Sequence, residues 1–453
     1  MSTSTTSPLT TADPGAPHGR SPLLSWLAVL SVTTGIFSVV TTEILPIGLL
    51  TSIGSSFGVS DGTAGLMMTV PGVLAAVSAP LVTVATARAD RRLMLCAFVL
   101  LLALANFLAA VAPYYWLVLV SRIMVGVAIG GFWSVGVGLA GRLVERPAVG
   151  RATAVIFAAV PLGSVLGVPL GTFVGEVAGW RTAFAGMGAF TLALLALMLL
   201  VVPPLPPVRA TRLQVLRDAV RAPGTRAALA VTFLVVLAHF GTYTYVTPFL
   251  EQVTGIGPGT VTLFLLLYGA AGIVGNFLGG ATVVHHPRAT FMSAAALISG
   301  ATLLLPVLGR WEIGAIALLA VWGIAYGAVP VCSQTWFANA SPDTPEATSV
   351  LFTASFQATI SVGALAGGLA LDRSAPSTLM LLGGATAALV VLLGGPKRAA
   401  VRWGGGSGHG GDRPDRPWPT RASTHSRSPS ADAGRKQART VPPGSAAVIW
   451  VRT

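Results

Sequence analysis

Two ionisable residues stand inside long apolar runs of the sequence. Glu43 follows Thr42 and comes three residues before Pro46, and Arg122 lies in another apolar run. A charged side chain at the centre of a bilayer costs about 2.5–3.5 kcal/mol on insertion scales, so it faces a cavity, pairs with another group or, as an acid, takes up a proton. Because desolvation favours the neutral acid, Glu43 could carry a proton, and Arg122 could bias a nearby carboxyl group toward ionisation. Glu43 therefore predicts proton coupling, and Arg122 is a candidate to take part in it.

Both residues also have a simpler interpretation. Glu43 could lie near the outer end of a long helix and reach interfacial water, and Arg122 could extend its side chain to the membrane surface. We favour the functional interpretation of Glu43, because Pro46 cannot donate to the carbonyl of Thr42 and leaves a hydrogen-bond acceptor beside the acid.

Aromatic and amide side chains recur within the apolar runs, where phenols and amides could line a cavity and bind polar groups of a ligand. The predicted substrate-binding residues are Trp133, Tyr243, Tyr245, Asn276, Gln334, Trp336 and Gln357. For any one of them, core packing with a satisfied hydrogen bond is the more frequent explanation, but as a set they predict a moderately polar, aromatic pocket. His239 could assist protonation, although a lone histidine in an apolar helix usually makes a packing contact.

One apolar run carries glycines at four-residue spacing. Gly163, Gly167 and Gly171 put small residues on one helical face, and Pro169 predicts a kink between them. Close helix packing is expected here, and we predict a role in gating in addition.

Membrane helices must position all of these residues. The 453 residues are 53% hydrophobic and 9% charged, whereas about 25% of the residues in soluble domains are charged. Apolar runs long enough to span a bilayer lie at approximately 23–50, 62–84, 93–112, 115–140, 151–177, 182–202, 227–250, 260–284, 290–309, 312–338, 347–371 and 376–395. We therefore predict an all-α membrane protein with twelve transmembrane helices in two pseudo-symmetric six-helix bundles.

The breaks between the runs predict the domain organisation. A linker rich in Pro and Arg at 203–226 separates the bundles 23–202 and 227–395. The tails 1–22 and 396–453 are predicted to be disordered, because their composition cannot form a core, and the first shows no removable signal peptide. The second tail holds eleven Lys or Arg and three Asp of a chain with net charge +13. It could contact anionic lipid or be an unselected extension.

Arginine placement predicts the orientation, because cytoplasmic turns retain positive charge. The turns after the second, fourth, sixth and eighth runs hold most of the arginines between helices, whereas the opposite turns hold only Arg181, Arg310 and Arg373. Both termini are therefore expected in the cytoplasm, with the protein in the plasma membrane of a bacterium. The turn with Asp343 and Glu346 does not support this orientation.

Several classes of function are excluded. The two cysteines, Cys96 and Cys332, lie in apolar runs, so no disulfide framework, metal site or cofactor is expected. No phosphate-binding loop, H-E-x-x-H or G-x-S-x-G motif is present, so we predict no enzyme. Because the positive charge is concentrated in one tail, nucleic acid is not an expected partner. The expected partners are a small molecule, protons and the lipid bilayer, and we expect a functional monomer.

Five segments carry a family resemblance. They read TTEILPIGLL from Thr41, RIMVG from Arg122, GSVLGVPLGT from Gly163, YTYVTPFL from Tyr243 and QTW from Gln334. Over approximately residues 25–395 the chain resembles the major facilitator superfamily, in particular its twelve-helix drug/proton antiporter branch with sugar efflux and arabinose efflux permease-like proteins. The resemblance implies alternating access between two bundles, and it supports proton coupling by Glu43 and Arg122.

The loop after the second run departs from the family pattern. That pattern is Gly-x-Leu-Ala-Asp-Arg-x-Gly-Arg, and its Asp helps to lock the inner gate. Here Ala87 takes the place of the Asp and Asp90 that of the second Gly. We expect Arg88, Asp90 and Arg91 to form a rewired gate.

The sequence as a whole predicts a secondary active transporter, with proton-coupled efflux of a small organic solute such as a drug or sugar. The alternatives are a proton symporter or facilitator for a sugar or nucleoside and, more remotely, a membrane sensor without transport.

Overall fold

Helices account for nearly all of the residues that the structure describes. The computed structural model describes residues 21–85, 89–136, 139–206, 221, 223–340 and 345–393. Arg88, both predicted tails beyond these limits and most of the predicted linker lie outside the described residues.

Each half of the chain contributes one series of helices. The first series is α1 (Pro22–Phe57), α2 (Asp61–Ala64), α3 (Leu66–Ala85), α4 (Arg91–Val111), α5 (Tyr115–Gly136), α6 (Ala140–Leu143), the 3₁₀ turn η1 (Arg146–Ala148), α7 (Val149–Leu162), the π-helical turn η2 (Gly163–Gly167), α8 (Val168–Ala178) and α9 (Trp180–Val201). The second is α11 (Pro223–Tyr243), α12 (Val246–Phe249), the π-helical turn η3 (Leu250–Thr254), α13 (Pro258–Val283), α14 (Pro287–Leu308), α15 (Glu312–Ala340), α16 (Pro345–Leu371) and α17 (Pro376–Leu393).

The predicted membrane fold is confirmed. Within the described residues, 11 helices are long and apolar enough to cross a membrane, and the shorter apolar helix Pro376–Leu392 stands at the place of the twelfth predicted span. The segment 151–177, predicted as one run, is a continuous span built from α7, η2 and α8.

The first helix is longer than predicted. It starts at Ser21, whose hydroxyl accepts the Leu24 amide, with Pro22 at the first helical position. It was expected to end near residue 50 but continues to Phe57, where Gly58 takes a left-handed conformation at φ 64°. The serines after residue 50 end the apolar pattern without ending the helix.

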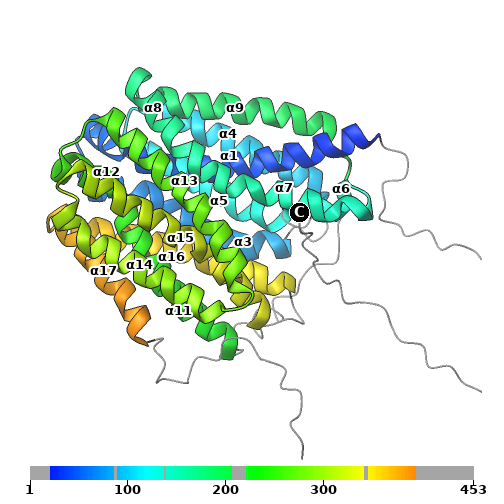
Figure 1. Cartoon of the computed structure of the whole chain (residues 1–453). Coiled ribbons are helices and arrows are strands. Elements are labelled where there is room, and N and C mark those ends of the chain that lie inside the picture. Colours follow the sequence, from blue (N-terminus) through cyan, green and yellow to red (C-terminus); the bar gives the residue numbers. More distant parts are fainter. Residues whose placement is uncertain are drawn as a thin grey trace, which may run out of the picture. The chain divides into compact units, whose positions relative to one another are not determined.

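The two series pack around separate cores. In Figure 1 the helices coloured blue to teal (α1, α4, α5, α7 and α9) lie together, and those coloured green to orange (α11, α13, α14, α15, α16 and α17) lie together. One hydrophobic core is built around Val32, Leu95 and Ile129 of the first series, and another around Val235, Ile298 and Trp322 of the second. The halves meet chiefly where α3 packs on α16 and where α8 and η2 pack on α13.

Candidate functional site

A cavity of about 360 Å³ lies between the two halves. Its size falls in the range of small-molecule sites, roughly 300–1,000 Å³. Apolar and aromatic side chains dominate its lining, which consists of Val40, Glu43, Ile44, Trp133, Phe157, Val160, Ser164, Phe240, Tyr326, Pro330, Gln334, Phe337, Phe352, Thr353, Phe356, Gln357 and Ile360. We call it the main cavity.

Glu43 contributes the only carboxyl group among the described residues of this lining. Its side chain is buried, and within the described part of the chain Oε1 has no hydrogen-bond partner. The Gln357 side chain is its polar neighbour, and Gln357 Oε1 likewise has no partner in the described part of the chain. A carboxyl group in this position is able to exchange a proton with a water-filled cavity.

Arg122 lies beside the main cavity rather than in its lining, and its side chain is fully buried. Its Nε donates to the Met67 carbonyl at 3.1 Å, and one terminal nitrogen donates to the Thr42 carbonyl at 2.8 Å. Both carbonyls stand four residues before a proline, at Pro71 and Pro46. Because a proline has no N–H to donate, each leaves its carbonyl free for the guanidinium.

The expectation that Pro46 frees the Thr42 carbonyl is thus confirmed. The matching role of Pro71 was not foreseen, because nothing in the sequence pairs Met67 with a residue 55 positions away. Asn106 was also missed, although its amide donates to the Thr42 hydroxyl at 3.1 Å.

A smaller cavity of about 150 Å³ adjoins the main cavity and shares Ile44, Val160, Ser164, Phe240, Tyr326 and Pro330 with it. We call it the side chamber. Its remaining lining includes His239 and Tyr243 from α11 and Tyr268 and Asn276 from α13.

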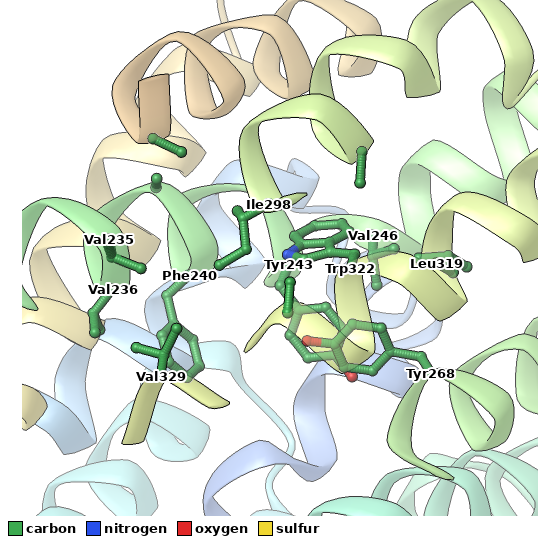
Figure 2. Packing of buried hydrophobic residues seen from close by; sticks show 14 of the residues in the cluster. Val235, Val236, Phe240, Tyr243, Val246, Tyr268, Ile298, Leu319, Trp322 and Val329 are labelled. Atoms are coloured by element: carbon green, nitrogen blue, oxygen red, sulfur yellow. The ribbon is translucent and has the colours of Figure 1, made fainter. Parts of the chain in front are cut away.

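Stacked rings form one wall of the side chamber. The His239 ring stacks between Tyr326 and Tyr243, and Tyr243 in turn stacks on Tyr268 with ring centroids 4.5 Å apart. Figure 2 shows Tyr243 and Tyr268 gathered under Trp322, each from a different helix. The Trp322 indole N–H donates to His239 Nδ1 at 3.1 Å.

The structure divides the predicted substrate-binding residues into three groups. Trp133, Gln334 and Gln357 line the main cavity, and Tyr243 and Asn276 line the side chamber. Tyr245 and Trp336 line neither cavity.

Those last two residues lie in the packed interior. The Tyr245 hydroxyl donates to the Ala364 carbonyl at 2.6 Å. Trp336 packs edge-on against Phe291, with the ring centroids 6.1 Å apart. This packing removes both residues from the predicted pocket, because their rings fill the space between neighbouring helices.

The phenylalanines of the main cavity were missed. Phe157, Phe240, Phe337, Phe352 and Phe356 line it, but the sequence interpretation considered only aromatic residues that carry a polar group. The four-residue spacing of Phe352, Phe356 and Ile360, next to Gln357, was the available signal of a helix face turned to a site.

The glycines predicted to act in gating lie against α1. A Cβ atom at Gly163, Gly167 or Gly171 would come within 3.0 Å of Val40, 2.6 Å of Thr41 or 1.8 Å of Leu45, respectively. The π-helical turn η2 and α8 therefore approach α1 on both sides of Glu43. Pro169 lies in the first turn of α8.

Asp90 and Arg91, predicted as gate residues, hold the chain segment that follows α9. Asp90 Oδ1 accepts the amides of Arg92 and Leu93 at the start of α4, and Oδ2 accepts the Leu205 amide at 3.0 Å. The Arg91 amide donates to the Leu205 carbonyl at 2.9 Å. Arg142 of α6 adds a hydrogen bond to the Pro206 carbonyl at 2.7 Å.

Hydrogen bonds join the two halves near Gly62, a region we call the Gly62 end. The Gly62 amide donates to Asp372 Oδ1 at 3.1 Å, and the Gln252 amide donates to Asp61 Oδ2 at 3.2 Å. Thr247 donates to the Ile47 carbonyl at 2.9 Å. Burial, together with the nearby charge of Asp61, raises the pKa of the Glu251 carboxyl group in this region. No pattern in the sequence predicted these contacts.

Comparison with known proteins identifies relatives of this architecture. The family model described as Major Facilitator Superfamily matches residues 29–351. The chain is 32% identical over 354 residues to transcription regulatory protein OpdE of Pseudomonas aeruginosa, covering 77% of this chain and 88% of that protein. It is 30% identical over 360 residues to purine ribonucleoside efflux pump NepI of Escherichia coli K12, covering 80% and 91%.

Solved structures share the fold at lower identity. A bacterial homologue of the human lysosomal transporter Spinster, in an inward-facing and unoccupied conformation, superposes with a TM-score of 0.65 at 16% identity, covering 83% of this chain and 96% of that one. The human organic anion transporter MFSD10 gives a TM-score of 0.58 at 17% identity, covering 83% and 100%.

Proposed function

Since the chain belongs to the Major Facilitator Superfamily, whose members move small molecules across membranes, we propose that it exports a purine ribonucleoside in exchange for protons. The observation that carries the proposal is the main cavity, where a single carboxyl group, Glu43, faces aromatic walls between the two halves. The name of the Escherichia coli relative, purine ribonucleoside efflux pump, supports the choice of substrate.

The lining of the main cavity suits a planar heteroaromatic ring. Faces of Trp133, Phe157 and Tyr326 are available for stacking, and the amides of Gln334 and Gln357 offer hydrogen-bond donors and acceptors to ring nitrogens or carbonyl oxygens. The described lining contains no Lys or Arg, so an uncharged substrate fits better than an anion.

Glu43 couples the substrate to protons by competition. The ionised Glu43 carboxylate accepts hydrogen bonds from a bound substrate, and its protonation removes one of these acceptors and weakens binding, so substrate and proton displace one another. Opening of the cavity to the other side of the membrane then reverses the exchange. A membrane potential supplies about 2.3 kcal/mol per charge per 100 mV, enough to concentrate a solute without ATP.

In the cell, this exchange runs across the bacterial inner membrane with both termini in the cytoplasm. The arginine-rich turns of the sequence support that orientation. The Gly62 end then faces the outside, and one chain with its two halves forms the transport unit.

The proposal is tested with purified protein in proteoliposomes, by accumulation of labelled inosine under an imposed pH gradient. We expect Glu43→Gln to reduce gradient-driven accumulation to the level of protein-free liposomes, because an amide cannot take up the transported proton, while inosine-for-inosine exchange persists. The exposed Glu176 lies outside both cavities, so Glu176→Gln is the matched control.

Four outcomes would contradict the proposal. Full gradient-driven accumulation by the Glu43→Gln variant removes proton coupling through this residue. Movement of inosine in the same direction as the protons indicates a symporter. Movement of inosine that does not depend on the proton gradient indicates a facilitator. Absence of any inosine movement by the wild type rejects the substrate and favours the regulatory role that the name of the Pseudomonas relative raises.

A further inference from the structure

The side chamber contains polar groups that the proposed proton exchange does not use. The four side chains concerned are His239, Tyr243, Tyr268 and Asn276, and all of them line the chamber. They come from α11 and α13 of the second half, whereas Glu43 comes from α1 of the first half.

The contact with Trp322 fixes the state of His239. An indole N–H can only donate a hydrogen bond, so His239 Nδ1 must accept with its lone pair at 3.1 Å. The ring proton is therefore on Nε2, and the imidazole is neutral. Stacking between Tyr326 and Tyr243 holds the ring in place. No second hydrogen bond from this ring reaches any described residue, so Nε2–H is available as a donor.

Two more groups lack partners. The Tyr268 hydroxyl is buried without a hydrogen-bond partner within the described part of the chain, and its residue is 6% exposed. The Asn276 amide makes no hydrogen bond to the residues that the structure describes. A buried polar group is rarely left unpaired, so a ligand that pairs with the Tyr268 hydroxyl recovers the free energy that its desolvation cost, and the half-buried Asn276 amide offers a second partner.

The chamber selects an uncharged occupant. None of the described residues in its lining is Asp, Glu, Lys or Arg, and the neutral His239 adds no charge. Gly269, Gly272, Gly323 and Gly327 are also part of the lining and add no polar side chain to it. A volume of about 150 Å³ suits one ring with several hydroxyl groups, each of which both donates and accepts hydrogen bonds.

We propose that the side chamber is a second subsite, which binds the uncharged, polyhydroxylated sugar ring of the substrate while the planar base lies in the main cavity. This inference rests on the proposed function. The two cavities share several lining residues, among them Ile44, Phe240 and Tyr326. The bond between base and sugar then lies beside these side chains. Tyr268 and Asn276 are then specificity-determining residues.

The test compares a nucleoside with its free base. Unlabelled inosine and hypoxanthine compete with labelled inosine for exchange in proteoliposomes, and the ratio of their inhibitory concentrations is measured. We expect Tyr268→Phe, which removes only the hydroxyl group, and Asn276→Leu each to reduce the preference for inosine about fivefold, the equivalent of one lost hydrogen bond. Tyr114→Phe is the matched control, because Tyr114 is 62% exposed and lies outside the chamber.

Each outcome has a distinct meaning. If wild type exchanges inosine but both variants keep its preference over hypoxanthine, the subsite is rejected and the proposed function stands. If wild type exchanges neither compound, the proposed function fails and the subsite fails with it. Thermal unfolding of Tyr268→Phe and Asn276→Leu shows whether the variants are folded. A misfolded variant binds neither inosine nor hypoxanthine, so it is distinguished from a folded variant that has lost only the preference.

Discussion

Arg122 shows how a buried cation is held without a buried anion bonded to it. Its hydrogen bonds go to the carbonyls of Met67 and Thr42, with a longer one to the Glu43 carbonyl at 3.3 Å, and a desolvated guanidinium needs such acceptors. The prolines Pro71 and Pro46 free the carbonyls of Met67 and Thr42 by withdrawing their usual helical donors. The Glu43 carboxyl group thereby stays without a bonded cation, as the proposed proton exchange requires.

This arrangement predicts a functional cost for removing a proline. In Pro46→Ala the new N–H competes with Arg122 for the Thr42 carbonyl. Loss of a hydrogen bond to a charged group is worth about 1.5–3 kcal/mol, so we expect a roughly tenfold or larger fall in gradient-driven inosine accumulation. Pro306→Ala in α14 is the control, since Pro306 also lies inside a helix but away from Arg122. Unchanged accumulation by Pro46→Ala would show that the freed carbonyl is dispensable.

At the scale of elements, α13 and α15 approach until their backbones touch. A Cβ atom at Gly275 would lie 1.9 Å from the Ile324 carbonyl oxygen, and one at Gly327 would lie 2.0 Å from the Gly272 carbonyl oxygen. The atoms in the way belong to the backbone and cannot rotate aside. The close pairing of α13 and α15 also forms the glycine-lined wall of the side chamber.

Gly275→Ala should therefore push α13 away from α15. Overpacking of this kind costs about 1–3 kcal/mol, and we expect a lower Tm in detergent together with weaker inosine binding. Gly280→Ala on the same helix is the control, because nothing lies within 4 Å of its added Cβ atom. Equal Tm values for the two variants would contradict the tight contact.

Apolar periodicity and length predicted the helices well, because a membrane span must be about 20 apolar residues long wherever it packs. The same information did not predict the side-chain contacts that depend on which helices pack together. Tyr245 looked like a pocket residue, yet its hydroxyl bonds the Ala364 carbonyl 119 positions away. Phe352 and Phe356 were not considered for the pocket, yet they line the main cavity. Their spacing marks one face of a helix, but which helices lie opposite that face depends on how distant parts of the chain pack.

At the scale of the whole molecule, the contacts at the Gly62 end hold the halves together on one side. Gly62 and Asp61 of the first half bond Asp372 and Gln252 of the second. Alternating access between the halves requires these bonds to break when this end opens. Their free energy therefore sets part of the balance between the two conformations.

Asp372→Ala should shift that balance toward an open Gly62 end. One hydrogen bond is worth about 1 kcal/mol, or roughly a fivefold change in population. Spin labels at the exposed Ser55 and Ser374, with both native cysteines replaced by alanine, would report a larger share of long distances. Glu312→Ala removes another exposed acid and is the control. If Asp372→Ala leaves the distance distribution unchanged, the hydrogen bond between Gly62 and Asp372 does not hold this end closed.

The contacts of Asp90, Arg91 and Arg142 with Leu205 and Pro206 attach the first residues after α9 to α4 and α6. These residues therefore move with the first bundle when the bundles rock. A deletion that removes Leu205 and Pro206 would take away the partners of Asp90 and Arg142 and release the chain that follows α9 from both helices.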